Sequence, residues 1–215
     1  MLFFEPDTER ALAAVPYAAG HGTEEERLGA GSIYYVITCM ARARVCVCLG
    51  SGGGFVPCLM RQAQMDLGID MAETFLVDAV LPEAGYGGPE VAMGWIHEGS
   101  LLRQQFGDIV ILSCLTGQAA TGFFAKNATA IDYLHIDADH SFNAALADFE
   151  TYLPLLKPSA FVTMHDTVTE SIQNVLSTIL LKYPKFQCID LPDVGAGLAI
   201  LRCKVLPSNF AGTDS

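Results

Sequence analysis

A segment near the middle of the chain constrains the fold most strongly, because two apolar runs in it stop at acidic and histidine residues. The run 131–136 ends at Asp137, and the run 159–164 ends at His165 and Asp166. Such runs are typical of buried parallel strands that end in functional loops. Parallel strands joined by a helix point the same way, so both ends should lie at one edge of a sheet. The sequence therefore predicts that the three polar residues are neighbours.

The residues between these two strands have the periodicity of an amphipathic helix. Apolar side chains recur at spacings of three and four, at Phe142, Leu146, Phe149, Leu153 and Leu156. We expect this stripe to lie on the sheet, with Asp148 and Glu150 facing water. Ser141 precedes the stripe and is predicted to cap the helix.

Strands and helices alternate along the rest of the chain. Further buried strands are predicted at 44–49, 74–77 and 108–114, and the runs 186–191 and 197–202 are typical of an antiparallel hairpin. This alternation indicates an α/β fold. We expect a Rossmann-like, seven-stranded, mostly parallel sheet with helices on both faces and a C-terminal antiparallel hairpin.

No long linker divides the sequence, so one domain is expected over residues 1–215. Residues 1–22 carry little pattern and are predicted to be a loosely ordered lead-in. Order is expected to begin at Thr23 and Glu26, which have the spacing of a capping box. The glycine-rich stretch 81–100 is too long for an ordinary turn and is predicted to be a lid-like insertion.

The charge of the chain excludes several classes of partner. Its 24 acidic and 12 basic residues give a formal net charge of -12 without a basic run, so neither nucleic acid nor an anionic membrane surface is expected to bind. The seven cysteines have neither disulfide-framework nor zinc spacing, which favours thiols in a reducing cytoplasm. The start of the chain lacks the features of a signal peptide. We expect a small neutral or cationic ligand, and the oligomeric state, a homo-oligomer included, stays open.

A glycine-rich loop follows the first predicted strand. Gly50, Gly52 and Gly54 form a G-x-G-x-G pattern, whereas a dinucleotide-binding loop would need glycine where Phe55 stands. Glycine lets the backbone approach a ligand, and the following helix offers N–H groups to a carboxylate. Asp78 ends the next strand and is placed to bind a ribose diol. A structural turn and a turn-capping aspartate are the alternatives.

Together these features resemble the class I methyltransferases that use S-adenosylmethionine. The resemblance covers residues 33–202, and segment 49–54 is similar to the first motif of the family. The segments 136–142, 155–158 and 165–166 are similar to small-molecule O-methyltransferases related to macrolide-sugar enzymes and, more distantly, to catechol O-methyltransferase. The resemblance implies methyl transfer to a hydroxyl of a small molecule, such as a sugar or a phenol.

The resemblance also implies which residues bind the cofactor. The methionine end would lie on the glycine loop, at Gly50, Ser51, Gly52 and Gly54. The ribose would lie at Asp78 and the adenine at Gly117 and Gln118. Cys48 departs from the family, which usually has an acid two residues before the first glycine.

In metal-dependent members of the family, an acid after the fourth strand and an acidic pair after the fifth bind magnesium, and a base follows the first acid by three residues. These positions fall on Asp137, on His165 with Asp166, and on His140. Magnesium prefers oxygen, so His165 implies either a position outside the coordination sphere or a softer divalent ion such as manganese, iron or zinc. Asp166 with Thr167 is the alternative pair, although Thr167 is also expected to cap the next helix. Many relatives work without a metal.

The chemistry of methyl transfer favours His140 as a catalytic residue, together with Asp137. Transfer from a sulfonium to a hydroxyl needs alignment and a deprotonated oxygen, and a neutral imidazole can remove that proton. Alternatively, His140 is a helix-start histidine bonded to a nearby acid. His135 lies inside a strand and is predicted to be a core histidine. Trp95 and His97 either shape the acceptor pocket or pack within their loop.

Two other functions are weighed against methyl transfer. An NAD-dependent oxidoreductase is disfavoured by Phe55 at the third glycine position. A methyltransferase-like protein that binds its ligand without catalysis is the other alternative, because Cys48 and His165 depart from the family pattern.

Overall fold

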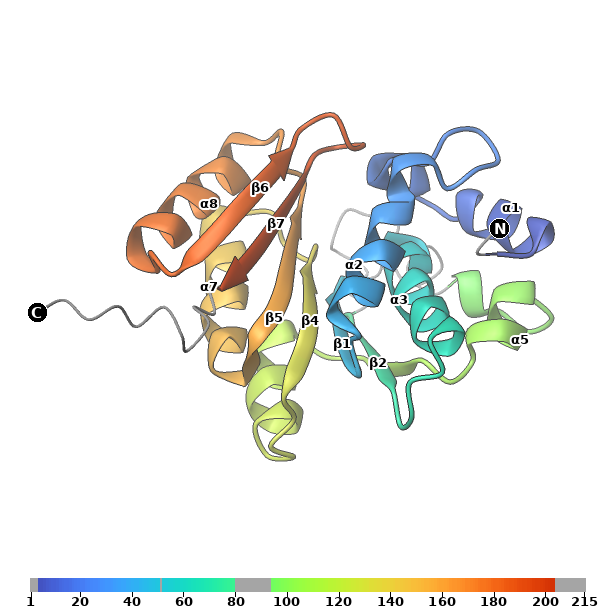
Figure 1. Ribbon diagram of the computed structural model, residues 1–215, viewed down its shortest axis with the longest axis horizontal. Coiled ribbons are helices and arrows are strands. Elements are labelled where there is room, and N and C mark those ends of the chain that lie inside the picture. Colours follow the sequence, from blue (N-terminus) through green and yellow to red (C-terminus); the bar gives the residue numbers. More distant parts are fainter. Residues whose placement is uncertain (1–3, 51, 80–93, 204–215) are drawn as a thin grey trace, which may run out of the picture.

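The computed structural model describes residues 4–50, 52–79 and 94–203, and these form one seven-stranded sheet (Figure 1). Its strands are β1 (Val45–Leu49), β2 (Glu73–Val77), β3 (Val110–Leu112), β4 (Ile131–Ile136), β5 (Leu156–His165), β6 (Phe186–Leu191) and β7 (Leu198–Cys203). The order is β3-β2-β1-β4-β5-β7-β6. β1 to β5 are parallel, and β7 is antiparallel to β5 and β6. The predicted fold class, including the C-terminal hairpin, is confirmed.

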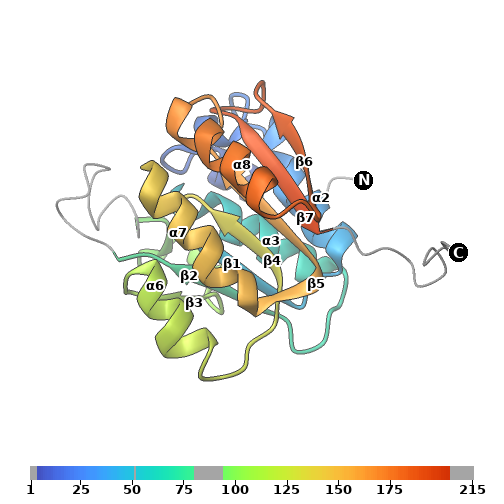
Figure 2. The same cartoon turned by 90° about the vertical axis from the view of Figure 1, so that its left-hand side faces the viewer.

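Two sets of helices cover the two faces of the sheet. One set comprises α1 (Pro6–Ala13), α2 (Ile33–Ala41), α3 (Phe55–Asp66) and α5 (Leu101–Phe106). The other comprises α6 (Thr116–Ala119), its π-helical continuation (Ala120–Phe124), α7 (Phe142–Tyr152) and α8 (Glu170–Lys182), which lie together in Figure 2. Short 3-10 turns form at Ala18–His21, Gly29–Ser32, Gly52–Gly54, Gly94–Ile96 and Leu153–Leu155.

Strand β1 is apolar at every position because both of its sides are buried. Cys46 and Cys48 pack into the core with α2 and α3, whereas Val47 and Leu49 pack into the opposite core with α7 and α8. A parallel strand between two helical layers has no solvent face, so its sequence does not alternate between polar and apolar residues. All seven cysteines are free thiols.

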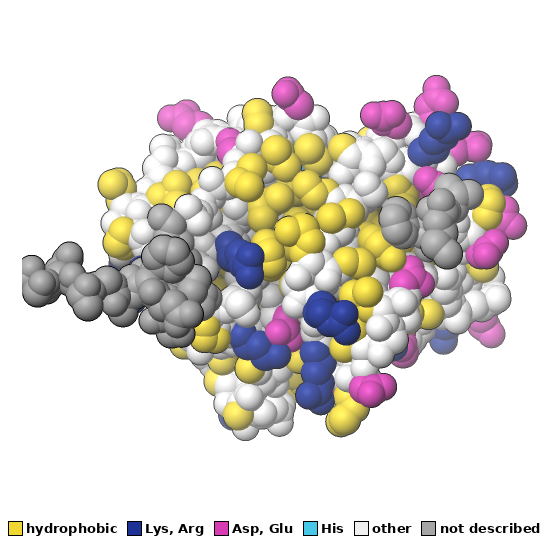
Figure 3. Space-filling model, in the orientation of Figure 1, with side chains coloured by type: hydrophobic (Ala, Val, Ile, Leu, Met, Phe, Trp, Pro, Cys, Tyr) yellow, Lys and Arg dark blue, Asp and Glu magenta, His cyan; other side chains and the backbone are white. Residues whose placement is uncertain are grey.

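The face seen in Figure 3 keeps an apolar area near its middle, on the side of the molecule where α2 and β7 lie. Val36 and Met40 of α2 are 42% and 65% exposed. The outer side of α2 is therefore only partly covered by the described residues.

The expected lead-in at residues 1–22 is wrong for the described part, residues 4–22. Leu12 and His21 are 0% and 1% exposed, so this segment belongs to the core. Thr8 Oγ1 donates a hydrogen bond of 2.7 Å to Gln105 Oε1 at α5. The predicted helix start at Thr23 is also wrong, because residues 23–28 form a loop closed by backbone pairing of residues 24 and 27.

The buried face of α7 differs from the predicted stripe. Ala145, Asp148, Phe149 and Tyr152 are buried, whereas Phe142 is 36% exposed. The α-helix ends at Tyr152, Leu153 lies in a 3-10 turn and Leu156 begins β5, so the last members of the stripe lie outside α7. The predicted cap is also wrong, since the Ser141 side chain makes no capping bond; its backbone N–H instead donates to Asp139 Oδ1 at 2.8 Å.

Replacing Asp148 with asparagine is expected to remove a pH-dependent loss of stability. Burial raises the pKa of Asp148 to about 6, although its carboxylate accepts a hydrogen bond from Thr116 Oγ1. A folded-state pKa above the unfolded value stabilises the fold at low pH, and this contribution is lost as the pH rises through about 6. The variant should gain roughly 1–3 kcal/mol at pH 7.5 and nothing at pH 4. Urea unfolding at both pH values tests this, and equal pH slopes in the two proteins would contradict it.

Candidate functional site

The carboxyl ends of the parallel strands form one row of polar residues. The backbone N–H of Gly50 donates to Val77 O, that of Asp137 to Leu49 O, and that of Asp78 to Leu112 O. These bonds place the glycine loop and both aspartates side by side, at the point where the strand order reverses between β1 and β4. Sheets of this kind bind ligands at such an edge.

Gly50 touches the backbone of Asp137 directly. Its φ is +83°, and a Cβ at this position would lie 2.0 Å from the Asp137 carbonyl oxygen. Gly54 has φ +90°, and a Cβ there would lie 2.3 Å from the ring of Trp95, which is only 4% exposed. Trp95 therefore packs on the glycine loop. Ser51 lies outside the described residues, as does most of the predicted lid, residues 80–93.

The adenine residues predicted from the resemblance lie beyond β3. Gly117 and Gln118 are exposed in the short helix α6, and Gln118 Oε1 accepts a hydrogen bond of 3.3 Å from Leu115 N. Cys48, which replaces the usual acid of the family, is buried, and its thiol donates to Gly50 O at 3.1 Å. Cys48 thus supports the glycine loop through this hydrogen bond to Gly50.

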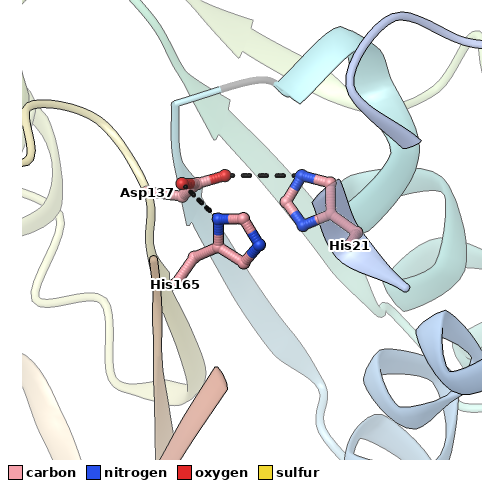
Figure 4. Close-up of side chains that lie close together, drawn as sticks. All are labelled: His21, Asp137 and His165. Atoms are coloured by element: carbon pink, nitrogen blue, oxygen red, sulfur yellow. Dashed lines mark hydrogen bonds and ion pairs between the residues drawn. The ribbon is translucent and has the colours of Figure 1, made fainter. Parts of the chain in front are cut away.

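Asp137 is surrounded by four of the five histidines in the chain. Its Oδ1 lies 3.2 Å from His140 Nε2 and 3.2 Å from His165 Nδ1. Its Oδ2 lies 3.5 Å from His21 Nε2 and 3.7 Å from His135 Nε2. Figure 4 shows the carboxylate of Asp137 facing the rings of both His21 and His165. We call these five residues, together with Asp166, the histidine–aspartate cluster: His21, His135, Asp137, His140, His165 and Asp166.

Asp166 closes the cluster on the side of β5. Its Oδ2 lies 3.1 Å from His165 Nδ1 and 3.1 Å from His140 Nε2. Its φ is +57°, a left-handed conformation that is uncommon outside glycine and that clusters at functional sites. The two carboxylates therefore share both imidazoles, and the predicted proximity of Asp137, His165 and Asp166 is confirmed.

The two neighbouring carboxylates favour the charged form of His165. Burial opposes this charge, but the carboxylates of Asp137 and Asp166 outweigh it and raise the pKa of His165 to about 10. Burial likewise disfavours the Asp137 carboxylate, yet His165 and the hydrogen bonds from its neighbours hold the pKa of Asp137 well below its usual value. The centre of the cluster is thus an ion pair.

His140 is the member of the cluster that a ligand can most easily reach. Its side chain is 25% exposed, against 6% for His165, 2% for His21 and 0% for His135. The hydrogen bond with Asp137 raises the pKa of His140 despite partial burial. Its Nε2 is shared between the carboxylates of Asp137 and Asp166.

His21 is the member that the sequence did not indicate. It stands between two glycines in a segment without periodic pattern. The only signal in the sequence that could have indicated it is that it is a histidine. Burial lowers the pKa of His21 to about 3, which leaves the ring uncharged. His135 is a buried histidine as predicted, bonded to Thr163 Oγ1 at 2.8 Å, but it also faces Asp137.

Thr167 points away from the cluster. Its hydroxyl donates to Asp190 Oδ1 at 2.7 Å, and α8 begins after Thr169 without a side-chain cap. The cap predicted at Thr167 is wrong, and the residue pair that meets Asp137 is His165 with Asp166.

A family described as a methyltransferase domain matches residues 47–167. No curated protein matches the chain in sequence. Among the described residues, no helix is both long and apolar enough to cross a bilayer.

Solved structures with a similar fold share little sequence with the chain. An O-methyltransferase from Bacillus cereus in complex with SAH is 16% identical, with 94% of this chain and 90% of that chain covered and a TM-score of 0.64. The O-methyltransferase TomG from Streptomyces achromogenes, involved in tomaymycin synthesis and in complex with SAM, is 13% identical, with 90% and 89% covered and a TM-score of 0.66. SAH-bound PaMTH1 from Podospora anserina is 14% identical, with 90% and 84% covered and a TM-score of 0.60. At these identities the likeness establishes the fold.

Proposed function

The chain belongs to the family of methyltransferase domains, and from this we propose that it transfers a methyl group from S-adenosylmethionine to a hydroxyl of a small molecule, such as a sugar or a phenol. One observation carries the proposal. An accessible histidine, His140, is bonded to two carboxylates at the sheet edge that also carries the glycine loop. The similar folds crystallised with SAM or SAH support this choice of cofactor.

The cofactor would bind across the ends of β1, β2 and β3. The methionine end would lie on Gly50, Ser51, Gly52 and Gly54. Asp78 would hold the ribose, and Gly117 and Gln118 would meet the adenine. The order of these residues along the sheet edge, with Asp78 between the glycine loop and α6, matches the order of the three parts of the cofactor.

His140 would act as the general base. It would take the proton of the acceptor hydroxyl, so that the oxygen could accept the methyl group. S-adenosylmethionine, when bound, would supply that methyl group and would leave as a neutral thioether that keeps the electron pair of the broken carbon–sulfur bond. Asp137 and Asp166 orient the imidazole through Nε2 and stabilise the imidazolium that forms, as a carboxylate does beside a catalytic histidine.

A divalent cation is part of the proposal, held by Asp137, His165 and Asp166. The donor set contains the Nδ1 atom of His165 and two carboxylate oxygens, which lie 3.2 Å (Asp137) and 3.1 Å (Asp166) from that nitrogen. Mg²⁺ prefers oxygen alone, so a manganese, iron or zinc ion is better matched than magnesium. Such an ion, when bound, lowers the pKa of a coordinated hydroxyl.

This geometry fits the two alternative functions, an NAD-dependent oxidoreductase and a non-catalytic binding protein, less well. Phe55 is fully buried and stacks on the ring of His21, with 5.5 Å between ring centroids, so it belongs to the core rather than to a dinucleotide loop. A protein that only bound the cofactor would not need His140 between two carboxylates. The seven free thiols support the proposed location in the reducing cytoplasm.

Binding of S-adenosylmethionine to the purified protein tests the cofactor assignment. Asp78→Ala should weaken the affinity roughly tenfold or more, because a ribose hydroxyl loses a buried partner. Gly52→Val should also weaken it markedly, because a side chain would occupy the space of the methionine end. Asp70→Ala, at an exposed position after α3, is the matched control. Titration calorimetry measures all three, and unchanged affinity in both site variants, or a preference for NAD, would contradict the assignment.

A further inference from the structure

The two carboxylate oxygens of Asp137 have different surroundings. Oδ1 hydrogen-bonds His140 and His165, whereas Oδ2 faces Nε2 of His21 at 3.5 Å and of His135 at 3.7 Å. The latter separations are too long for strong hydrogen bonds. His135 Nε2 is buried and has no hydrogen-bond partner among the residues that the structure describes. Buried polar nitrogens are normally paired, so this side of Asp137 has room for a group that the described residues do not supply.

Three imidazoles of the cluster are fixed through the nitrogen that points away from Asp137. The outer partners are all oxygens: Tyr34 Oη at 3.1 Å from His21 Nδ1, Thr163 Oγ1 at 2.8 Å from His135 Nδ1, and the Gly20 carbonyl at 2.8 Å from His165 Nε2. Metal-binding histidines characteristically donate their outer N–H to an oxygen, which fixes the ring and presents the inner nitrogen. All three rings have this arrangement around one carboxylate.

We propose that His21 is a further ligand, with Asp137 and His165, of the divalent transition-metal ion at this site, and that His135 faces the same ion. The ligand atoms of the first three residues lie within 4.8 Å of one another, and Figure 4 shows their side chains converging. Around an ion with bonds of about 2.0–2.2 Å, ligand atoms lie roughly 3–4.4 Å apart. Only a small contraction of the cluster is needed.

The donor set selects the class of ion. Imidazole nitrogens with a single carboxylate suit Zn²⁺, Fe²⁺, Co²⁺ or Ni²⁺, whereas Mg²⁺ takes oxygen ligands. Binding of the ion through His165 Nδ1 releases the proton that this nitrogen shares with Asp137 and Asp166. The site thus recruits a residue from the N-terminal segment, far in sequence from the other ligands. The role of the ion in methyl transfer rests on the proposed function, but its binding does not.

The test uses the full chain, stripped with a chelator and titrated with Co²⁺, whose visible absorption reports its ligands. We expect one equivalent to bind, and a 100-fold excess of Mg²⁺ should not displace it. In the proton spectrum of the Co²⁺ protein, three shifted exchangeable signals are expected, from His21 Nδ1–H, His135 Nδ1–H and His165 Nε2–H. Displacement by Mg²⁺, or the absence of shifted imidazole signals, would overturn the proposal without any substitution.

A variant of His21 provides a second measurement. His21→Gln should weaken Co²⁺ binding by roughly 10- to 100-fold or more. His97→Gln is the control, because His97 is exposed and lies outside the cluster. Equal Co²⁺ affinity in the two variants would refute the role of His21, and circular dichroism checks that both are folded.

Failure of this inference can be told apart from failure of the proposed function. A protein that binds S-adenosylmethionine and methylates an acceptor but takes up no Co²⁺ would refute the metal site alone. A protein that binds Co²⁺ through His21 but has no affinity for S-adenosylmethionine would refute the proposed function alone.

Discussion

Replacing His140 with alanine is expected to lower the turnover number by about two to four orders of magnitude, the usual contribution of a general base. Affinity for S-adenosylmethionine should change little, because the proposed cofactor residues lie on the other strands of the sheet edge. His140 is the most exposed imidazole of the cluster and is bonded to both Asp137 and Asp166. Asp70→Ala, at an exposed position after α3, is the control and should keep the full rate.

The pH profile separates catalysis by His140 from a structural role. A base works in its deprotonated form, so activity should fall as the pH drops through the pKa of His140. Asp137 raises this pKa above the ordinary value of 6.5, so the acidic limb should lie above that pH. In Asp137→Asn the charge is lost and the remaining activity should show a limb at lower pH. Transfer of a radiolabelled methyl group to a panel of hydroxylated acceptors measures both effects. A full rate in His140→Ala would remove the assignment of the base.

Replacing Gly50 with alanine is expected to be the most damaging single methyl addition at the sheet edge. The new Cβ would lie 2.0 Å from the Asp137 carbonyl oxygen, and the backbone at φ +83° disfavours any side chain. Neither backbone can move without breaking the bonds that Gly50 N and Asp137 N make to the neighbouring strands. We expect a loss of about 2–4 kcal/mol in the free energy of unfolding. Binding of S-adenosylmethionine should fall with it, because the glycine loop and Asp137 would be displaced together.

Gly122→Ala is the matched control for this loss. Gly122 lies in the π-helical turn, and a Cβ there meets nothing within 4 Å. Urea unfolding of both variants at one pH should show a large loss only for Gly50→Ala. Equal stabilities would mean that the loop can shift away from Asp137 at little cost.

The sequence predicted the sheet well because its strands are buried on both faces. Apolar runs that end at Asp78, Asp137 and His165 are visible in the sequence, and the directions of parallel strands then place their ends together. The buried face of α7 was mispredicted, because Asp148 is buried through a hydrogen bond from Thr116, a residue 32 positions away. The sequence around Asp148 does not indicate a partner so far away along the chain.

His21 could not be assigned for a related reason. Its burial depends on Phe55 and Tyr34, whose rings lie 5.5 Å and 5.6 Å from its own, and on the end of β5. These contacts connect segments that are far apart in the sequence, so the apolar periodicity within each segment does not reveal them. His135 was assigned to the core correctly, but the direction of its Nε2 toward Asp137 depends on side-chain geometry rather than on position in a strand.

The peptide carbonyl of Gly20 limits how far the chain can be truncated. It accepts hydrogen bonds from His165 Nε2 at 2.8 Å and from Ala196 N at 2.7 Å, so one oxygen joins the N-terminal segment, the end of β5 and the turn before β7. The segment that matches the methyltransferase family, residues 47–167, contains neither Gly20 nor Ala196. A fragment trimmed to that match would keep Asp137, His140 and His165 in its sequence, yet His165 would lose the acceptor that orients its ring.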